Sequence, residues 1–130
     1  MSSLTNYGEQ QILDHLFNLA TFAQPTIYIG VSTADPTEGG TGLNEPSGNG
    51  YARIQTAASD WTRNVSTVEN ANELTFPEAT GSWGTVTHAV LTDASTGGNV
   101  IAFAPLATPR GIVQNDTLRF PAGDITFSLD

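Results

Sequence analysis

The sequence predicts a mainly β, single-domain fold, either an antiparallel β-sandwich or a flattened barrel, with one N-terminal amphipathic helix. Three observations predict it. The chain has 130 residues, the size of one ordinary domain. Helical periodicity is confined to residues 6–20. From residue 26 onward, short runs rich in Val, Ile, Thr, Phe and Tyr alternate with clusters of Gly, Pro, Asn and Asp, as is typical of strands and turns.

The helix is predicted over residues 6–20, where apolar residues recur at spacings of three and four. Asn6, with Glu9 three residues later, resembles an N-capping pair, and Pro25 closes the segment. A helix this short gains its stability from docking rather than from intrinsic propensity. Because the apolar stripe is wide, we expect both flanks of the helix to be covered.

Seven strands are predicted in the β body, which we expect to extend over residues 26–130. Their ranges are 26–33, 51–57, 72–76, 85–92, 99–104, 117–120 and 125–129. A spacing near ten residues is typical of a sandwich or barrel. No second helix is predicted, so parallel crossovers are not expected.

A long connection over residues 35–50 interrupts the predicted strands. It is rich in Gly and Pro, so it is predicted to be neither strand nor helix, and it is long for an ordinary connection. We expect this loop either to be mobile or to be ordered by a partner chain. The loop and the N-terminal helix are therefore the two segments predicted to reach neighbouring subunits.

The charge balance excludes two classes of partner. The chain has thirteen acidic residues, four Arg and no Lys, for a net charge of −9. Sequence-independent binding to nucleic acid and binding to an anionic membrane both need clustered Lys and Arg. We therefore expect neither nucleic acid nor membrane as a partner. Cysteine is absent, which excludes thiol catalysis, disulfides and thiolate metal sites.

Candidate catalytic and metal-binding residues are few. The serine in Gly81-Ser82-Trp83-Gly84 does not have the spacing of a nucleophile elbow. His15 is predicted on the helix surface and His88 inside an apolar strand, so a zinc site is not expected. Asp35, Glu38 and Glu45 could supply oxygen ligands to calcium, but solvated carboxylates are the plainer interpretation. We expect no enzyme activity, no cofactor and no metal.

The candidate interaction residues are cations and large aromatic side chains. Arg forms bidentate pairs with carboxylates and is favoured at interfaces. Trp is a frequent anchor between chains, although here the Trp residues equally suit the ends of a sandwich core. The predicted interface residues are Tyr51, Arg53, Trp61, Trp83 and Arg110.

Several blocks of the sequence resemble a family of short phage virion structural proteins. The most specific are Gly50-Tyr51-Ala52-Arg53 and Ser82-Trp83-Gly84-Thr85-Val86. Further matches are Thr33-Ala34-Asp35-Pro36, Phe76-Pro77, Thr96-Gly97-Gly98-Asn99 and Ala122-Gly123. The likeness extends over nearly the whole chain. It implies a virion component without enzyme activity, of the kind described as capsid cement, tail-fibre or minor virion proteins.

The charge sign favours an outer surface, because packaged DNA would repel a strongly acidic protein inside the shell. We therefore expect an outer capsid cement (decoration) protein, made in the host cytoplasm. It would form a homotrimer and bind the major capsid protein through many weak contacts. The alternative is a tail-fibre or tail-tip adaptor. A carbohydrate-binding module is a further alternative, which would need a face of exposed aromatic side chains.

Overall fold

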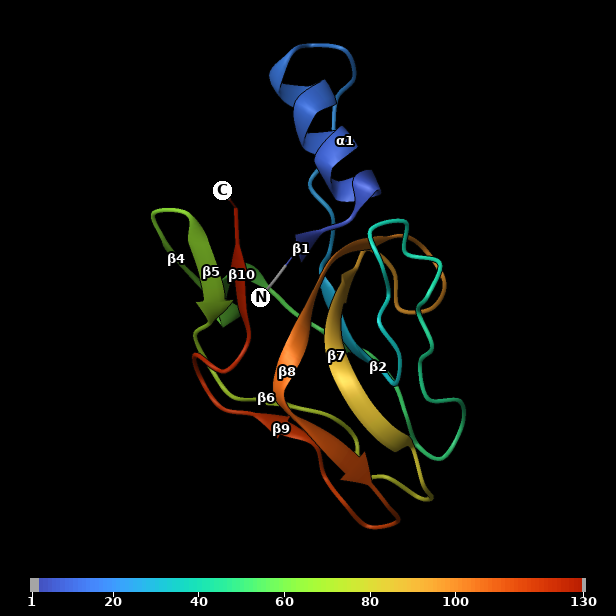
Figure 1. Cartoon of the computed structure of the whole chain (residues 1–130). Helices are drawn as coiled ribbons and strands as arrows, with labels where there is room; N and C mark the ends of the chain where they lie inside the picture. Colours follow the sequence, from blue (N-terminus) through green and yellow to red (C-terminus); the bar gives the residue numbers. More distant parts are fainter. Residues whose placement is uncertain (1–2, 130) are drawn as a thin grey trace.

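The computed structural model describes residues 3–129 and confirms a mainly β, antiparallel fold with one N-terminal helix (Figure 1). The elements before the long loop are β1 (Ser3–Leu4), α1 (Asn6–Leu16) and β2 (Tyr28–Ser32). The elements between residues 54 and 75 are β3 (Ile54–Gln55), a 3-10 turn η1 (Ala58–Asp60), β4 (Trp61–Asn64), β5 (Thr67–Asn70) and β6 (Leu74–Thr75). The remaining strands are β7 (Gly84–Thr92), β8 (Val100–Ile112), β9 (Arg119–Phe120) and β10 (Thr126–Ser128).

The strands form three open sheets. The main sheet has five strands in the order β1-β8-β7-β2-β3, and every neighbouring pair is antiparallel. A second sheet has the order β10-β5-β4, and β6 pairs with β9 in a two-stranded ribbon. Within residues 3–129 no sheet closes on itself, so the flattened-barrel alternative is not adopted.

The hydrophobic core lies on one face of the main sheet. Ile29, Val31 and Ala89 of the central strands pack with Phe76 and Phe120 from the β6–β9 side. The remaining core residues are Leu74, Ala79, Trp83, Val86, Ile112, Leu118 and Ile125. Phe76 contacts Phe120 edge-on, with ring centroids 6.0 Å apart. Large apolar side chains from distant segments thus hold the three sheets together.

A β-bulge changes which residues of β7 face the core. Simple alternation predicts that Val86, His88 and Val90 share one face and that Ala89 lies on the other. The pairing with β8 shifts between Val86 and His88. Across this shift β7 advances by two residues and β8 by five, and the irregular pairing lets Val86 join Ala89 in the core cluster.

One predicted strand is much longer in the structure, several others are shorter, and one hairpin was not predicted. The strand predicted at residues 99–104 continues to Ile112 through Pro105 and Pro109. Proline is tolerated there because β1 pairs only with Ala102 and Phe103, so the rest of that edge needs no donor. The β4–β5 hairpin, residues 61–70, was missed because its residues are mostly polar and exposed and give no apolar alternation.

The helix ends earlier than predicted, at Leu16 rather than at residue 20. Its N-cap is Thr5, whose hydroxyl accepts a hydrogen bond from the amide of Gly8, and not Asn6. The first turn contacts the start of β8, and the rest of α1 stands clear of the sheets (Figure 1). Within residues 3–129, no helix is long and apolar enough to cross a membrane.

Candidate functional site

The projecting helix is attached to the body by hydrogen bonds around its first turn. Thr5 is buried, and its hydroxyl donates to the carbonyl of Val100 while its amide donates to that of Ile101. Gly8 packs directly on that strand, because a Cβ atom at this position would overlap the carbonyl oxygen of Ile101. The amide of Asn6 also donates to the carbonyl of Glu38. These contacts fix the direction in which α1 leaves the body.

The outer end of α1 is closed by its own chain. Asn18 has a left-handed backbone conformation, with φ of 61°. The amides of Asn18 and Leu19 donate to the carbonyls of His15 and Asp14, a Schellman arrangement that ends the helix. The returning segment is tied back where the amide of Phe22 donates to Nδ1 of His15. The segment over residues 6–23 is therefore a defined projection, and it rejoins the body where the carbonyl of Ile27 accepts from Thr56.

This projection exposes large apolar side chains. Leu16 is 67% exposed and Phe17 is 69% exposed, and Leu13 and Leu19 are also exposed. The prediction that both flanks of the helix are covered is therefore wrong for the isolated subunit. The apolar stripe was visible in the sequence, but its lack of a partner depends on where β8 directs the helix.

The long loop behaves differently, because a buried cluster within the same subunit holds it. Arg53 has a side chain only 3% exposed, and it forms a bidentate ion pair with Glu45. The hydroxyl of Tyr51 donates to Glu45 at 2.6 Å and accepts from the amide of Val31 at 3.0 Å. Gly30 leaves the necessary space, since a Cβ atom there would lie 2.7 Å from that hydroxyl. We call Glu45, Tyr51 and Arg53 the loop clamp.

The loop clamp also reaches the connection between β7 and β8. The guanidinium of Arg53 donates to the hydroxyl of Thr92 and to the carbonyls of Ala94 and Gly97. In that connection the carboxylate of Asp93 accepts from the backbone and side chain of Asn99. One arginine thus joins two loops that are far apart in the sequence.

The charges in the loop clamp support each other. Burial alone would raise the pKa of Glu45, but hydrogen bonds from Arg53 and Tyr51 outweigh it and hold the pKa below its usual value. Burial and the neighbouring Glu45 carboxylate raise the pKa of the Tyr51 hydroxyl well above its usual range. The ion pair is therefore charged, and the tyrosine is neutral, across the physiological pH range.

The loop covers an edge of the main sheet. Strand β3 pairs with β2 only at Tyr28 and Ile29, so β2 continues past the end of β3. Beyond that point, the amide of Thr33 donates to the carbonyl of Asn44, and the amide of Asn44 donates to the hydroxyl of Ser32. The loop thus takes the place of a strand along this part of β2. It covers backbone groups that an open sheet edge would leave unpaired. Asn44 and Glu45 are thus held within the subunit without a partner chain, and whether the loop reaches a neighbouring subunit stays a prediction.

The two tryptophans lie in different environments. Trp83 is buried in the core, donates from Nε1 to the carbonyl of Asn49 and contacts the ring of Tyr51 edge-on. Trp61 is half-buried, donates to the hydroxyl of Thr56 and faces a shallow hollow beside Gln24. A carbohydrate-binding module needs a face of exposed aromatic side chains. Of the two tryptophans, Trp61 alone is partly exposed and could contribute to such a face.

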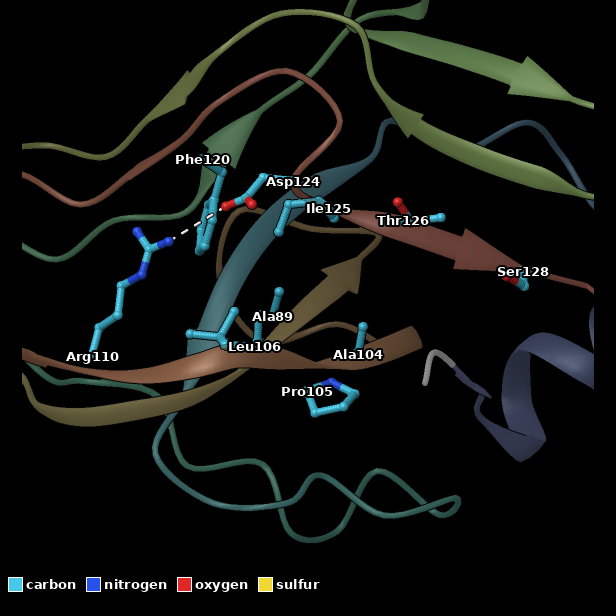
Figure 2. A pocket seen from close by; sticks show the side chains of 11 residues that line it. Ala89, Ala104, Pro105, Leu106, Arg110, Phe120, Asp124, Ile125, Thr126 and Ser128 are labelled. Carbon is cyan, nitrogen blue, oxygen red and sulfur yellow. Dashed lines mark hydrogen bonds and ion pairs between the residues drawn. The ribbon is translucent and has the colours of Figure 1, made fainter.

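Arg110 lines a cleft of about 400 Å³ between β8 and residues 120–128 (Figure 2). Its guanidinium lies over the ring of Phe120, 5.3 Å from the centroid, and pairs with Asp124 at 3.4 Å. It also donates to the carbonyl of Arg119. Ala89 and Ala104 form part of the lining, so the cleft offers small apolar surfaces and one half-exposed ion pair.

The five predicted interface residues are not brought together. Tyr51, Arg53 and Trp83 meet around the loop clamp, while Trp61 and Arg110 lie in separate hollows. Whether any of them contacts a partner stays a prediction. Among the described residues, the arginines that form ion pairs with acidic side chains are Arg53, Arg110 and Arg119, the last at 4.0 Å.

The candidate metal-binding residues are also separated. The carboxylate of Asp35 accepts from the amide of Thr37, and Glu45 belongs to the loop clamp. His15 is exposed on the projection, and His88 shares a hydrogen bond with Thr87. Over residues 3–129 no three His, Asp or Glu residues gather as metal ligands would.

Comparison with known proteins gives one family. The model described as podophage GP4 fiber I protein gp80 matches residues 3–128. No curated protein matches the chain. The family match supports the resemblance to phage virion structural proteins, and it favours the tail-fibre alternative over the capsid cement protein.

Proposed function

The chain belongs to the family of podophage GP4 fiber I protein gp80, and from this membership we propose that it is a structural subunit of a tail fibre. It is a phage virion structural protein, and the family is one of fibre proteins rather than enzymes. The role as a fibre subunit is mechanical. It requires a rigid body and a surface by which the body is held.

The rigid body is supplied by the three packed sheets and the loop clamp. The long loop and the β7–β8 connection are both bonded to Arg53. The residues of the described chain that lie buried include polar side chains, and none of their buried nitrogen and oxygen atoms lacks a hydrogen-bond partner. A body of this kind is complete without a partner.

The holding surface is the exposed apolar face of α1. The exposure of Leu16 and Phe17 supports this surface, because side chains of this size are usually buried when they lie together on a helix. A partner that covers them stabilises the assembly by removing apolar surface from water. We propose that copies of this chain are its own partners, in a homotrimer, and that a tail protein anchors the fibre.

Copy number and position on the particle test this function. The copy number of a tail-fibre subunit is a small multiple of the rotational symmetry number of the tail. Gold-conjugated antibody against such a subunit labels the tail. A capsid cement protein is present in hundreds of copies and labels the whole shell. Quantitative mass spectrometry of purified virions, with the major capsid protein as internal standard, distinguishes the two.

The cement alternative also makes a mechanical prediction. Particles that lack a cement protein release their DNA at a lower temperature than complete particles. We expect particles without this chain to keep their DNA to the same temperature and to lose attachment to host cells instead. Earlier DNA release with full attachment would contradict the tail-fibre proposal.

A further inference from the structure

We propose that the hollow beside Trp61 binds an uncharged sugar, whose ring packs on the indole and whose hydroxyl groups bond to two glutamine amides. The hollow is formed by residues 24–27, residues 55–58 and Trp61, and we call it the tryptophan hollow. Its volume of about 630 Å³ lies in the range of small-molecule sites. It shares no residue with the exposed apolar face of α1, so the inference goes beyond the structural role proposed above.

Trp61 is fixed by contacts within the body, which hold the indole ready for a ligand. Its Nε1 donates to the hydroxyl of Thr56 at 2.9 Å, and that hydroxyl donates to the carbonyl of Ile27 at 2.8 Å. The indole also contacts the ring of Phe127 edge-on, with ring centroids 6.5 Å apart. Thr56 is buried, whereas Trp61 is only half-buried and lines the hollow. Because the indole is already held in place, a ligand that packs on it loses little binding energy to ordering it.

Two side-chain amides that line the hollow are available to a ligand. Gln24 belongs to the segment that returns from the projection and Gln55 belongs to β3, and both residues are exposed. Over residues 3–129 neither side-chain amide makes a hydrogen bond within the subunit. Each amide offers two donor hydrogens and an acceptor oxygen. Neighbouring hydroxyl groups on a sugar ring both donate and accept, so they match these amides.

The charges of the molecule select an uncharged ligand. The chain carries a net charge of −9, which repels anions. The described residues that line the hollow include no ionisable side chain, so a cation has no partner there. Asp60 follows these residues in the chain, but its carboxylate already accepts from the amide of Ala57 and from the side chain of Asn72.

The lining also has the mixed character that a sugar requires. Pro25, Ile27 and Trp61 supply apolar surface. Thr26 and the two glutamines supply neutral polar groups. The C–H groups on one side of a pyranose ring pack on an aromatic face, which is the negative side of its quadrupole. An aliphatic ligand would leave the two amides without partners, and nucleic acid is disfavoured by its phosphate charge. A neutral pyranose ring satisfies both kinds of surface.

Titration of the full chain with methyl glycosides, followed by nuclear magnetic resonance, tests the proposal. The probes are the methyl glycosides of glucose, galactose, mannose and N-acetylglucosamine, each added to about 50 mM. We expect at least one of them to shift the indole N–H signal of Trp61, with a Kd on the order of 1–10 mM. The signal of Trp83 is the internal control, because this residue is buried and donates to the carbonyl of Asn49. Methyl glucuronide, which adds a carboxylate to the glucose ring, is expected to cause no shift.

Three substitutions locate the site, with binding followed on the backbone amides of Ala57 and Ala58. Trp61→Ala should abolish binding, and Gln55→Ala should raise the Kd about three- to tenfold through the loss of one hydrogen bond. Gln114→Ala is the matched control, because Gln114 is exposed in the turn after β8, and it should leave the Kd unchanged. Circular dichroism melts verify folding. Gln55→Ala removes only an exposed amide, so it tests the site even if Trp61→Ala does not fold.

Binding of the fluorescently labelled chain to host cells identifies the source of the sugar. Displacement from the cells by the free glycoside would assign the sugar to a surface polysaccharide. A chain that binds the glycoside but not the cells would take its sugar from soluble saccharides.

Three results would overturn the inference. One is the absence of any Trp61 shift with the four glycosides. Another is an equal shift with methyl glucuronide, or a shift with n-butanol alone, which would indicate a site without selectivity for neutral sugars. The third is a Kd that Gln55→Ala and Gln114→Ala change equally. Because the titration uses the isolated chain, its failure is distinct from a failure of the tail-fibre proposal, which copy number and position test.

Discussion

The loop over residues 35–50 and the projection over residues 6–23 have opposite relations to the rest of the subunit. Both were predicted to reach neighbouring subunits. The loop clamp ties the loop to its own body, and Asn44 completes the edge of β2. The projection is attached at Thr5 and leaves Leu16 and Phe17 in solvent.

The difference teaches that length and Gly/Pro content do not identify a surface that needs a partner. A polar loop can satisfy its donors and acceptors within the subunit when one charged side chain is placed among them. An apolar helix has no such means, because leucine and phenylalanine are covered only by other apolar groups. The segment that needs a partner is therefore the one that exposes large apolar residues.

The largest expected effect on subunit stability is at the loop clamp. Arg53→Ala leaves Glu45 without its ion-pair partner and frees the carbonyls of Ala94 and Gly97. We expect the free energy of unfolding to fall by about 3–5 kcal/mol, measured by denaturant titration. Arg119→Ala is the matched control, since its pair with Glu73 is exposed and 4.0 Å long, and it should cost less than about 0.5 kcal/mol. Equal losses in both variants would show that the clamp does not stabilise the loop.

A smaller effect is expected from the tyrosine of the clamp, and it depends on pH. Tyr51→Phe removes the hydroxyl that bonds to Glu45 and Val31, which should cost about 1–2 kcal/mol at neutral pH. In the wild-type chain the pKa of Tyr51 is raised above its ordinary value of 10.0. Its contribution is therefore present below pH 10 and is lost as the pH rises further. Stability curves of both proteins from neutral to alkaline pH should converge; a constant difference would contradict the raised pKa.

The carboxylate of the clamp gives the corresponding acid prediction. The pKa of Glu45 is held below its ordinary value of 4.5, so its contribution is present above that pH and is lost as the pH falls through the folded-state pKa. Glu45→Gln should therefore be less stable than the wild-type chain at neutral pH and approach it in acid. Thermal melts at pH 7 and in acid measure this change. A difference that stays the same in acid would contradict it.

The smallest effect on the subunit is expected at the exposed end of α1. Phe17→Ala should change the free energy of unfolding by less than about 0.5 kcal/mol in a dilute monomer, because the ring is exposed. The same substitution at the buried Phe76 should cost about 3–5 kcal/mol. Denaturant titrations at low protein concentration make the comparison. A large loss at Phe17 would mean that the ring packs within its own subunit.

Much of the fold could be predicted from the sequence because its strongest signals are local. The apolar alternation of residues 85–92 and the helical spacing around Leu13 and Leu16 gave the right element types. The end of the helix was predictable in principle, since Asn at position 18 is a known left-handed cap. The β4–β5 hairpin was not, because its exposed polar strands are defined by pairing with β10.

The candidate site was less predictable because it depends on tertiary placement. Arg53 was predicted as an interface residue, and only the fold shows that it pairs with Glu45 of its own subunit. The burial of Trp83 follows from Asn49 and Tyr51 approaching it from the long loop. The exposure of Phe17 follows from the anchoring of Thr5 on β8, which no local pattern encodes.

The central claim is that the body is stable without a partner, whereas the exposed apolar face of α1 is covered only on assembly. Hydrogen exchange of backbone amides tests this claim most directly. The measurement compares the dilute chain with chains assembled in the virion. The account predicts that the amides of Val31, Thr33 and Asn44 are equally protected in both states and that the last two turns of α1 gain protection only on assembly. A helix already protected in the dilute chain, with protection gained instead over residues 35–50, would contradict it.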